Sequence, residues 1–293
     1  MKKFFVIGNP INHSLSPELH NFWIKKNNID AVYDKIKLEE LELKDFINKL
    51  RNEEIHGINV TVPFKNKVIK YLDKLSLEVE TTDSVNTIYK SGNDIIGHNT
   101  DVAGFELGLR HSKINVLHKS ILILGAGGVV PSIIYSLLSM GCKKIFLSNR
   151  TIEKAEEIKK KFNEVEVVKW GKIPDFDIVI NATSVGLKGD SLDLNLNTKD
   201  KIFYDVIYNP KETLFLKRAK LFGNKTENGK MMFIYQAHQS FTIWNKVMPK
   251  IDDEIIKVVL NIKKKFSESY IFFLIINKII KIFIMTICRI IKF

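Results

Sequence analysis

The fold is decided by the stretch Ser120-Ile121-Leu122-Ile123-Leu124-Gly125-Ala126-Gly127-Gly128. Four consecutive aliphatic residues without alternation predict a strand buried on both faces, which is typical of parallel sheets. Residues 129–140 have the pattern of a helix that begins close to Gly128, and Pro131 fits only its first turn, where no intrahelical donor is lost. A strand, a glycine turn and a helix N-terminus together predict a pyrophosphate site, the alternative being a tight turn that binds nothing.

Composition narrows the class of protein. The 293 residues suffice for two domains, and the 45% hydrophobic and 27% charged fractions are typical of a soluble globular protein. The two cysteines, Cys142 and Cys288, provide neither a disulfide framework nor a metal cluster, so we expect a cytoplasmic protein without a metal. Residues 1–8 contain only a short apolar run, which predicts a first strand and not a signal peptide.

The formal net charge of +12 is unevenly distributed. Half of it lies in residues 263–293, and the remainder is spread thinly over the chain. No basic patch is interleaved with aromatic residues, so we expect no nucleic-acid partner. The thin positive excess suits anionic small molecules.

Two serines follow the first predicted strand, in Ser14-Leu15-Ser16-Pro17. Ser16 is predicted to be the N-cap of a helix whose first residue is Pro17. No cap role is evident for Ser14, and two hydroxyls at a strand-to-helix junction suit the binding of a polyol.

Residues 57–65 alternate with the period of a strand. The pattern predicts an apolar face of Ile58, Val60 and Val62 and a polar face of Asn59 and Thr61. Lys65 then stands at the carboxyl end of the strand, where α/β sheets carry their sites.

Asp101 begins a predicted helix over residues 102–109. Asp is a favoured residue near a helix N-terminus, which is one explanation for it. The alternative is that its carboxylate faces Lys65 across a cleft.

The next strand after the glycine turn ends in Asn149-Arg150-Thr151, and Lys154 follows. NAD sites carry an acidic residue on the ribose hydroxyls, about 20 residues past the glycines. A guanidinium, a hydroxyl and an ammonium instead suit a 2′-phosphate. The sequence therefore favours NADP over NAD.

An ordered series of short motifs over about residues 1–265 resembles the shikimate dehydrogenase family. The matching motifs are Ser14-Leu15-Ser16-Pro17, Asn59-Val60-Thr61-Val62-Pro63-Phe64-Lys65, Val85-Asn86-Thr87, Asn99-Thr100-Asp101, Gly125-Ala126-Gly127-Gly128, Asn149-Arg150-Thr151, Asn181-Ala182-Thr183-Ser184, Tyr204-Asp205-Val206-Ile207-Tyr208-Asn209-Pro210 and Gln236-Ala237. The sequence differs from the family at Thr82-Asp83-Ser84, where small apolar residues with glycine are more usual, and the added polarity is expected to bear on the choice of polyol.

The resemblance implies an α/β fold with an N-terminal α/β substrate domain, a Rossmann NADP-binding domain, and C-terminal helices that return to the first domain. The expected ranges are 1–101, completed by about 232–265, for the substrate domain and 102–231 for the Rossmann domain. The implied reaction is the reversible, NADPH-dependent reduction of 3-dehydroshikimate to shikimate in aromatic amino-acid and chorismate biosynthesis. A monomer or homodimer is expected.

The resemblance also implies roles for particular residues. The expected catalytic pair is Lys65 and Asp101, and the sequence leaves open which of them carries the proton. The expected substrate ligands are Ser14, Ser16, Thr61, Asn86, Tyr208 and Gln236. The expected cofactor ligands are Gly125, Ala126, Gly127, Gly128, Asn149, Arg150, Thr151, Lys154, Thr183 and Gly229.

Two other functions share this fold. The first is a quinate/shikimate dehydrogenase that uses NAD, against which Arg150 and Thr151 argue. The second is a non-catalytic ligand-sensing module, against which the presence of both Lys65 and Asp101 argues.

Residues 269–293 extend beyond the usual end of the family. Residues 270–293 form an apolar run of about the 20 residues that a membrane span requires, but two lysines fall inside it. On a helix, its basic residues Lys278, Lys281, Arg289 and Lys292 follow one narrow stripe. Such a helix suits an anionic membrane surface or another subunit better than a span, and the alternative is a disordered extension.

Overall fold

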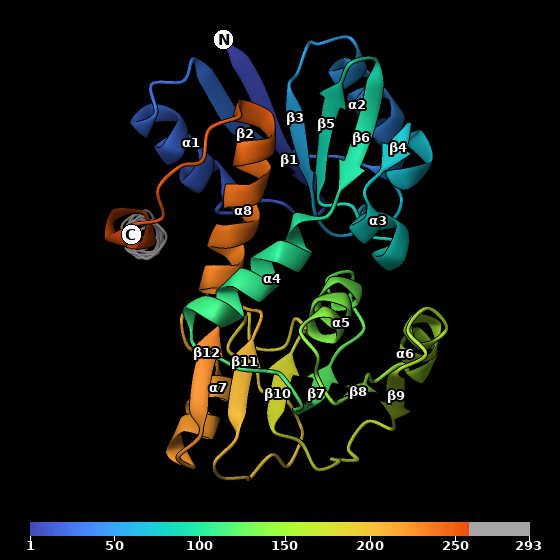
Figure 1. Cartoon of the computed structure of the whole chain (residues 1–293), viewed down its shortest axis with the longest axis vertical. Helices are drawn as coiled ribbons and strands as arrows, with labels where there is room; N and C mark the ends of the chain where they lie inside the picture. Colours follow the sequence, from blue (N-terminus) through green and yellow to red (C-terminus); the bar gives the residue numbers. More distant parts are fainter. Residues whose placement is uncertain (258–293) are drawn as a thin grey trace, which may run out of the picture. The chain divides into compact units, whose positions relative to one another are not determined.

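Residues 1–257 are described by the computed structural model, and their strands form two six-stranded sheets (Figure 1). Both sheets and all labelled elements lie within the unit Met1–Pro249. The predicted tail helix over residues 270–293 lies outside the described residues. Among residues 1–257, no helix has both the length and the apolar character needed to cross a membrane.

The first sheet has the strand order β2-β1-β3-β5-β6-β4, with β5 antiparallel to both of its neighbours. Its strands are β1 (Lys2–Gly8), β2 (Ala31–Lys37), β3 (Gly57–Val60), β4 (Lys74–Leu75), β5 (Thr87–Ser91) and β6 (Asp94–His98). Its helices are α1 (Ser16–Lys26), α2 (Leu43–Arg51) and α3 (Leu77–Thr82), with 3-10 turns η1 (Glu40–Glu42) and η2 (Ile69–Tyr71). These elements are called the first lobe.

The second sheet is parallel throughout, in the order β12-β11-β10-β7-β8-β9. Its strands are β7 (Ser120–Leu124), β8 (Lys144–Ser148), β9 (Val165–Val168), β10 (Ile178–Asn181), β11 (Ile202–Asp205) and β12 (Lys225–Asn228). Its helices are α5 (Val130–Ser139), α6 (Ile152–Lys159) and α7 (Leu214–Leu221). These elements are called the second lobe.

The second lobe has the doubly wound order 3-2-1-4-5-6 when its strands are counted from β7, so the strand order reverses between β7 and β10. All four aliphatic residues of β7 are fully buried, as the unbroken apolar run predicts. The predicted α/β fold with a Rossmann-type second half is thus confirmed. The site of a bound dinucleotide is expected outside the carboxyl ends of β7 and β10.

Helix α4 (Thr100–His111) lies between the two sheets, and helix α8 (Lys230–Asn245) runs beside it and continues along the first sheet (Figure 1). Their close approach requires glycine, because a β-carbon at Gly104 would lie 2.7 Å from Cβ of Gln236. One turn further along α4, a β-carbon at Gly108 would lie 3.0 Å from the backbone nitrogen of Met232. The crossing places the N-terminus of α4 beside the middle of α8.

The predicted cap of α1 is wrong. The helix begins at Ser16, with Leu15 in the N-cap position, and no side chain caps it. Because Ser16 lies inside the first turn, its hydroxyl is not directed at the free N–H groups. The Ser14 hydroxyl instead accepts a hydrogen bond from the Ser16 backbone N–H, at 3.3 Å.

The strand predicted to run from residue 57 to Pro63 is shorter than its alternation suggests. β3 ends at Val60, and the chain then turns, with the Phe64 N–H donating to the Thr61 carbonyl at 2.9 Å. Val62 is therefore 58% exposed and does not share the buried face of Ile58 and Val60.

A buried histidine lies within the aromatic core of the first lobe. His20 on α1 stacks on Tyr33, with ring centroids 4.2 Å apart and planes inclined by 6°. Its Nε2 atom has no hydrogen-bond partner among the described residues. Burial lowers the pKa of His20 to about 3, because the charged ring would be removed from water.

His20 should make stability depend on pH. The folded-state pKa lies below the unfolded value, so the unfolded chain binds a proton that the folded chain does not between about pH 6.5 and 3. The free energy of unfolding should fall as the pH is lowered through this window, by about 1 kcal/mol per pH unit from this group. His20→Phe should remove that component, as measured by urea unfolding at several pH values.

His118→Asn is the matched control, because His118 is exposed and Asn tolerates its positive φ of 59°. This variant should keep the pH dependence of the natural chain. An unchanged slope in His20→Phe would show that the folded protein accommodates a protonated ring at this position.

Candidate active site

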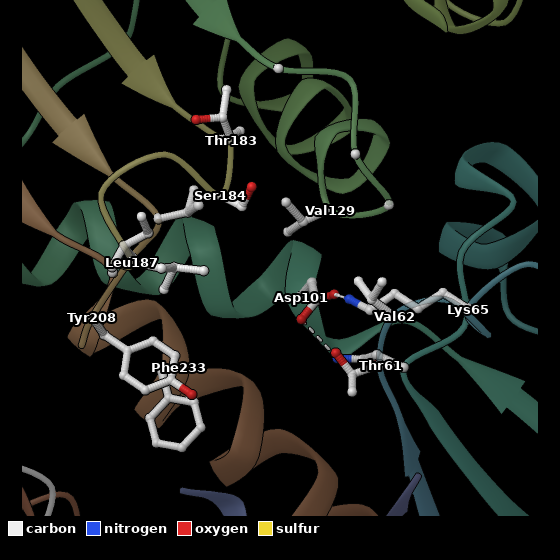
Figure 2. A pocket seen from close by; sticks show the side chains of 18 of the residues that line it. Thr61, Val62, Lys65, Asp101, Val129, Thr183, Ser184, Leu187, Tyr208 and Phe233 are labelled. Atoms are coloured by element: carbon white, nitrogen blue, oxygen red, sulfur yellow. Dashed lines mark hydrogen bonds and ion pairs between the residues drawn. The ribbon is translucent and has the colours of Figure 1, made fainter. Parts of the chain in front are cut away.

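One cavity of about 740 Å³ is lined by residues of both lobes and of α4 and α8 (Figure 2). Every predicted site residue lines it, namely Ser14, Ser16, Thr61, Lys65, Asn86, Asp101, Gly125, Ala126, Gly127, Gly128, Asn149, Arg150, Thr151, Lys154, Thr183, Tyr208, Gly229 and Gln236. The individual roles of these residues stay predictions. Residues Thr82, Asp83 and Ser84 do not line this cavity, so their polarity is not directed at the polyol site.

Lys65 and Asp101 form an ion pair in the cavity wall (Figure 2). The Lys65 ammonium donates to Oδ2 of Asp101, and the two side chains are 13% and 9% exposed. Lys65 follows the turn after β3, and Asp101 lies in the first turn of α4, where the helix dipole favours a carboxylate. The carboxylate predicted to face Lys65 is therefore in direct contact with it.

Asp101 is held by polar groups behind it. Its backbone N–H donates to the Asn99 side chain at 3.0 Å, and Asn86 Nδ2 donates to Asp101 Oδ1 at 2.9 Å. Asn86 Nδ2 also donates to the Thr100 hydroxyl at 2.9 Å. Both amide hydrogens of Asn86 are thus directed at protein oxygens, and Asn86 orients the carboxylate.

A residue that the sequence analysis did not single out as a ligand supports this arrangement. Asn59 lines the cavity, accepts a hydrogen bond from the Tyr33 hydroxyl at 2.7 Å, and donates to the Asn86 carbonyl at 2.9 Å. Its place in the polar row of β3 was the signal that could have identified it. Burial raises the pKa of Tyr33, and a hydrogen bond with the Ser16 hydroxyl opposes that rise.

Aromatic side chains form another wall of the cavity (Figure 2). Tyr208 stacks on Phe233 of α8, with ring centroids 4.4 Å apart and planes inclined by 16°. Removal from water raises the pKa of Tyr208 to about 12, and the negative charge of Glu18 adds to the effect. Gln236, one turn after Phe233, donates to its carbonyl at 2.9 Å. Phe233 is a lining residue that no sequence motif indicated.

A buried carboxyl group fixes the loops after β10 and β11. Asp205 accepts hydrogen bonds from Asn181 Nδ2 at 3.1 Å, the Ile207 N–H at 3.0 Å and the Thr213 hydroxyl at 2.6 Å. Burial raises the pKa of Asp205 to about 6, although the three donors oppose the rise. Asn181 in turn accepts from the Thr183 hydroxyl at 2.7 Å, which fixes Thr183 in the cavity wall.

The glycine turn leaves open space where a pyrophosphate is expected. Gly125 has a φ of +108°, and a β-carbon there would lie 2.8 Å from the Ala182 carbonyl oxygen. At Gly127 and Gly128, by contrast, a β-carbon would meet protein atoms only at 4.0 and 3.9 Å. Glycine is thus required by the protein backbone at Gly125, whereas at Gly127 and Gly128 it keeps space free for a ligand.

The charged side chains of the cavity fall into two groups. Asp101, paired with Lys65, is the only carboxylate among the described residues that line it. The end beside β8 carries the exposed side chains of Arg150 and Lys154. Asn149 Nδ2 donates to the Thr151 carbonyl at 2.7 Å and orders the turn between them. This end suits a phosphate group.

Residues 1–257 contain no cluster of three or more His, Cys, Asp or Glu side chains arranged to hold a metal ion. The donors of the cavity are amides, hydroxyls and cations, which suit a dinucleotide and a polyol. The fold and the cavity together define a dinucleotide-binding α/β oxidoreductase.

Comparison with known proteins identifies the family. Residues 6–88 match the family described as "Shikimate dehydrogenase substrate binding domain". Residues 108–187 match the family described as "Shikimate / quinate 5-dehydrogenase". Shikimate dehydrogenase (NADP(+)) of Pelagibacter ubique (strain HTCC1062) is 57% identical over 88% of this chain and 98% of its own length. The chain belongs to the shikimate dehydrogenase family, as its motifs predict.

Solved structures agree with this assignment. The crystal structure of shikimate dehydrogenase from Aquifex aeolicus has a TM-score of 0.81 and 36% identity, covering 89% of this chain and 97% of that one. Shikimate 5-dehydrogenase from Thermus thermophilus, in complex with NADP(H) and shikimate, has a TM-score of 0.82 and 28% identity, covering 89% and 99%.

The two kinds of glycine in the turn should respond differently to alanine. Gly127→Ala should leave the unfolding transition nearly unchanged, because no protein atom blocks the methyl group, yet it should weaken NADPH binding. Gly125→Ala should lower the free energy of unfolding, because its φ is positive and its neighbour is backbone. Urea unfolding and NADPH fluorescence titration measure the two effects. Unweakened NADPH binding in Gly127→Ala would place the pyrophosphate elsewhere.

Proposed function

We propose that the chain catalyses the reversible reduction of 3-dehydroshikimate to shikimate with NADPH. The observation that carries the proposal is the Lys65–Asp101 ion pair in the same cavity as the open glycine turn and the cationic end beside β8. The relatives named shikimate dehydrogenase (NADP(+)) support the same substrate and cofactor.

The reaction converts a ketone into a secondary alcohol, so one hydride must reach the carbonyl carbon and one proton its oxygen. When bound, NADPH supplies the hydride. Gly127 and Gly128, at the N-terminus of α5, would hold the pyrophosphate with backbone N–H groups. The protein thereby contributes orientation of the two reactants.

The proton is assigned to the Lys65–Asp101 pair as a unit. Lys65 is the donor that faces the cavity, and Asp101 fixes its position and compensates its charge. With 13% and 9% exposure, the pair is largely shielded from water, which strengthens its electrostatic effect on the carbonyl oxygen. In the reverse reaction the pair accepts the proton that the alcohol releases.

The substrate is proposed to lie among the polar side chains of the first lobe and α8. Ser14, Ser16 and Thr61 provide hydroxyls for its carboxylate and ring hydroxyls, and Gln236 provides an amide. The Tyr208 hydroxyl is neutral at physiological pH, and burial raises its pKa further, so it serves as a hydrogen-bond donor or acceptor.

NADP is the cofactor that the site favours. Arg150, Thr151 and Lys154 suit the 2′-phosphate, and among residues 1–257 no carboxylate lines the cavity beside them to bind a bare ribose. The quinate/shikimate alternative with NAD lacks such an observation. The ligand-sensing alternative gives no reason for a shielded Lys–Asp pair.

The domain division is part of the proposal. Strands β1 to β6 fall within residues 1–101 and β7 to β12 within 102–231, which supports a substrate domain and a cofactor domain. α8 supports completion of the substrate domain by residues from 232 onward, of which 258–265 lie outside the described residues. A cytoplasmic role in chorismate biosynthesis, as a monomer or homodimer, completes the proposal.

The direct test is steady-state kinetics with shikimate and quinate, each paired with NADP and NAD. Shikimate with NADP should give the highest kcat/KM of the four pairs. Absence of NADPH formation from shikimate would refute the proposal, and a preference for quinate with NAD would establish the alternative.

The catalytic pair should behave as one unit. Lys65→Ala and Asp101→Asn should each lower kcat by about 100-fold or more, because proton transfer loses its positioned group. The double variant should be little worse than the poorer single variant, since residues that act together are non-additive. Lys67→Ala is the matched control, because Lys67 pairs with Glu40 on the surface and should leave kcat unchanged. Losses that multiply would instead indicate independent roles.

Cofactor choice should depend on Arg150. Arg150→Ala should weaken NADP binding by about 1.5–3 kcal/mol, because charge-assisted phosphate contacts are strong, while NAD binding stays nearly unchanged. Lys159→Ala, at an exposed position on α6 outside the cavity, is the control. Dissociation constants for both cofactors measure the difference, and equal losses would contradict the 2′-phosphate assignment.

A further inference from the structure

Two hydrogen bonds with buried donors join the lobes at the start of α5. The Ser84 hydroxyl of the first lobe donates to the Gly128 carbonyl at 3.1 Å. Asn99 Nδ2, at the N-cap of α4, donates to the Ser132 hydroxyl at 2.8 Å and to the Thr82 hydroxyl at 3.0 Å. Ser84, Asn99 and Ser132 are 2%, 1% and 0% exposed. Of the polar segment Thr82-Asp83-Ser84, Ser84 thus bonds to the glycine turn directly, and Thr82 bonds to the Asn99 side chain that reaches α5.

On the first-lobe side, each bond lies next to one catalytic residue. The Val85 N–H, directly after Ser84, donates to the Lys65 carbonyl at 2.8 Å. The Asn99 side chain that reaches Ser132 also accepts the Asp101 N–H at 3.0 Å. One bond thus leads to the backbone of Lys65 and the other to the backbone of Asp101.

On the second-lobe side, both bonds end on the segment that is proposed to hold the pyrophosphate. Gly128 is part of the turn, and Ser132 lies in the first two turns of α5. The two bonds are thus attached at two points, one in the glycine turn and one in α5. A rigid link is needed there, because hydride transfer depends on the distance between the two bound reactants.

A third contact between the lobes is exposed to solvent. Asp83 pairs with Lys161, but their side chains are 58% and 43% exposed. Exposed ion pairs contribute little and are screened by salt. This ion pair is therefore a weaker candidate for fixing the turn than the two hydrogen bonds with buried donors.

We propose that Ser84 and Ser132 are positioning residues, which hold the glycine turn at a fixed place relative to the Lys65–Asp101 pair. The inference rests on the proposed function, because only a reaction between two bound partners needs that distance. Neither serine lines the main cavity, so neither touches the substrate site directly.

The test compares the full-length natural chain with Ser84→Ala, Ser132→Ala and the double variant. The double variant should lose about tenfold in kcat, because small displacements of reacting groups are costly. These rates are measured for the reduction of 3-dehydroshikimate with NADPH, and the KM for 3-dehydroshikimate should stay within about twofold, since the proposed substrate ligands are intact. The isotope effect with NADPH deuterated at the transferred position should rise, because hydride transfer then limits the rate more strongly.

A second readout needs no substrate. Hydrogen–deuterium exchange at the backbone amides of residues 125–130 and 132 should be faster in the double variant without any ligand, because both hydrogen bonds from the first-lobe side to that segment are lost. Ser136→Ala is the matched control, as Ser136 is equally buried on α5 but bonds only to Met140 of its own helix. This control should keep natural kcat, isotope effect and exchange.

The outcomes are separable. Natural kcat and isotope effect in the double variant, or losses no larger than those of Ser136→Ala, would overturn the positioning role. If the natural chain shows no activity on shikimate, the proposed function fails, and the exchange measurement alone decides whether the serines fix the turn: unchanged exchange overturns the inference.

Discussion

The close crossing of α4 and α8 is the constraint on which the site depends. The absence of a side chain at Gly104 lets α8 approach until Gln236 lies against α4, where a β-carbon would be only 2.7 Å away. The same helix α4 carries Asp101 in its first turn, and the same helix α8 carries Phe233 in the cavity wall. One packing contact therefore brings the Asp101 carboxylate, the Gln236 amide and the Phe233 ring to one cavity.

The parts of the fold that the sequence could predict are those specified locally. The aliphatic run of β7 and the glycines after it specify a strand and a turn without reference to other residues, and both are present. β12 could not be found in this way, because Lys225–Asn228 is polar and becomes a strand only through pairing with β11. β9 is equally short and also went unpredicted, since it forms at the sheet edge beside β8.

In the site, too, local sequence identified some features, and others depend on contacts between distant elements. All the residues that the motifs identified line one cavity, although Lys65 and Asp101 are 36 positions apart in the sequence. Motifs did not reveal that both amide hydrogens of Asn86 are engaged by protein oxygens, because hydrogen-bond geometry depends on neighbours from other elements. The cap of α1 was misassigned for the related reason that a shift of one residue in a helix start changes which hydroxyl faces the free N–H groups.

The contacts between the lobes differ in strength around the cavity. At the start of α5 they are hydrogen bonds between groups that are at most 2% exposed, except for the open Gly128 carbonyl. At the outer edge, Asp83 and Lys161 form an exposed pair, and such pairs contribute only about 0–1 kcal/mol. Breaking the Asp83–Lys161 pair therefore costs little free energy. Breaking the contacts at the start of α5 would leave buried polar groups without hydrogen-bond partners, which costs more.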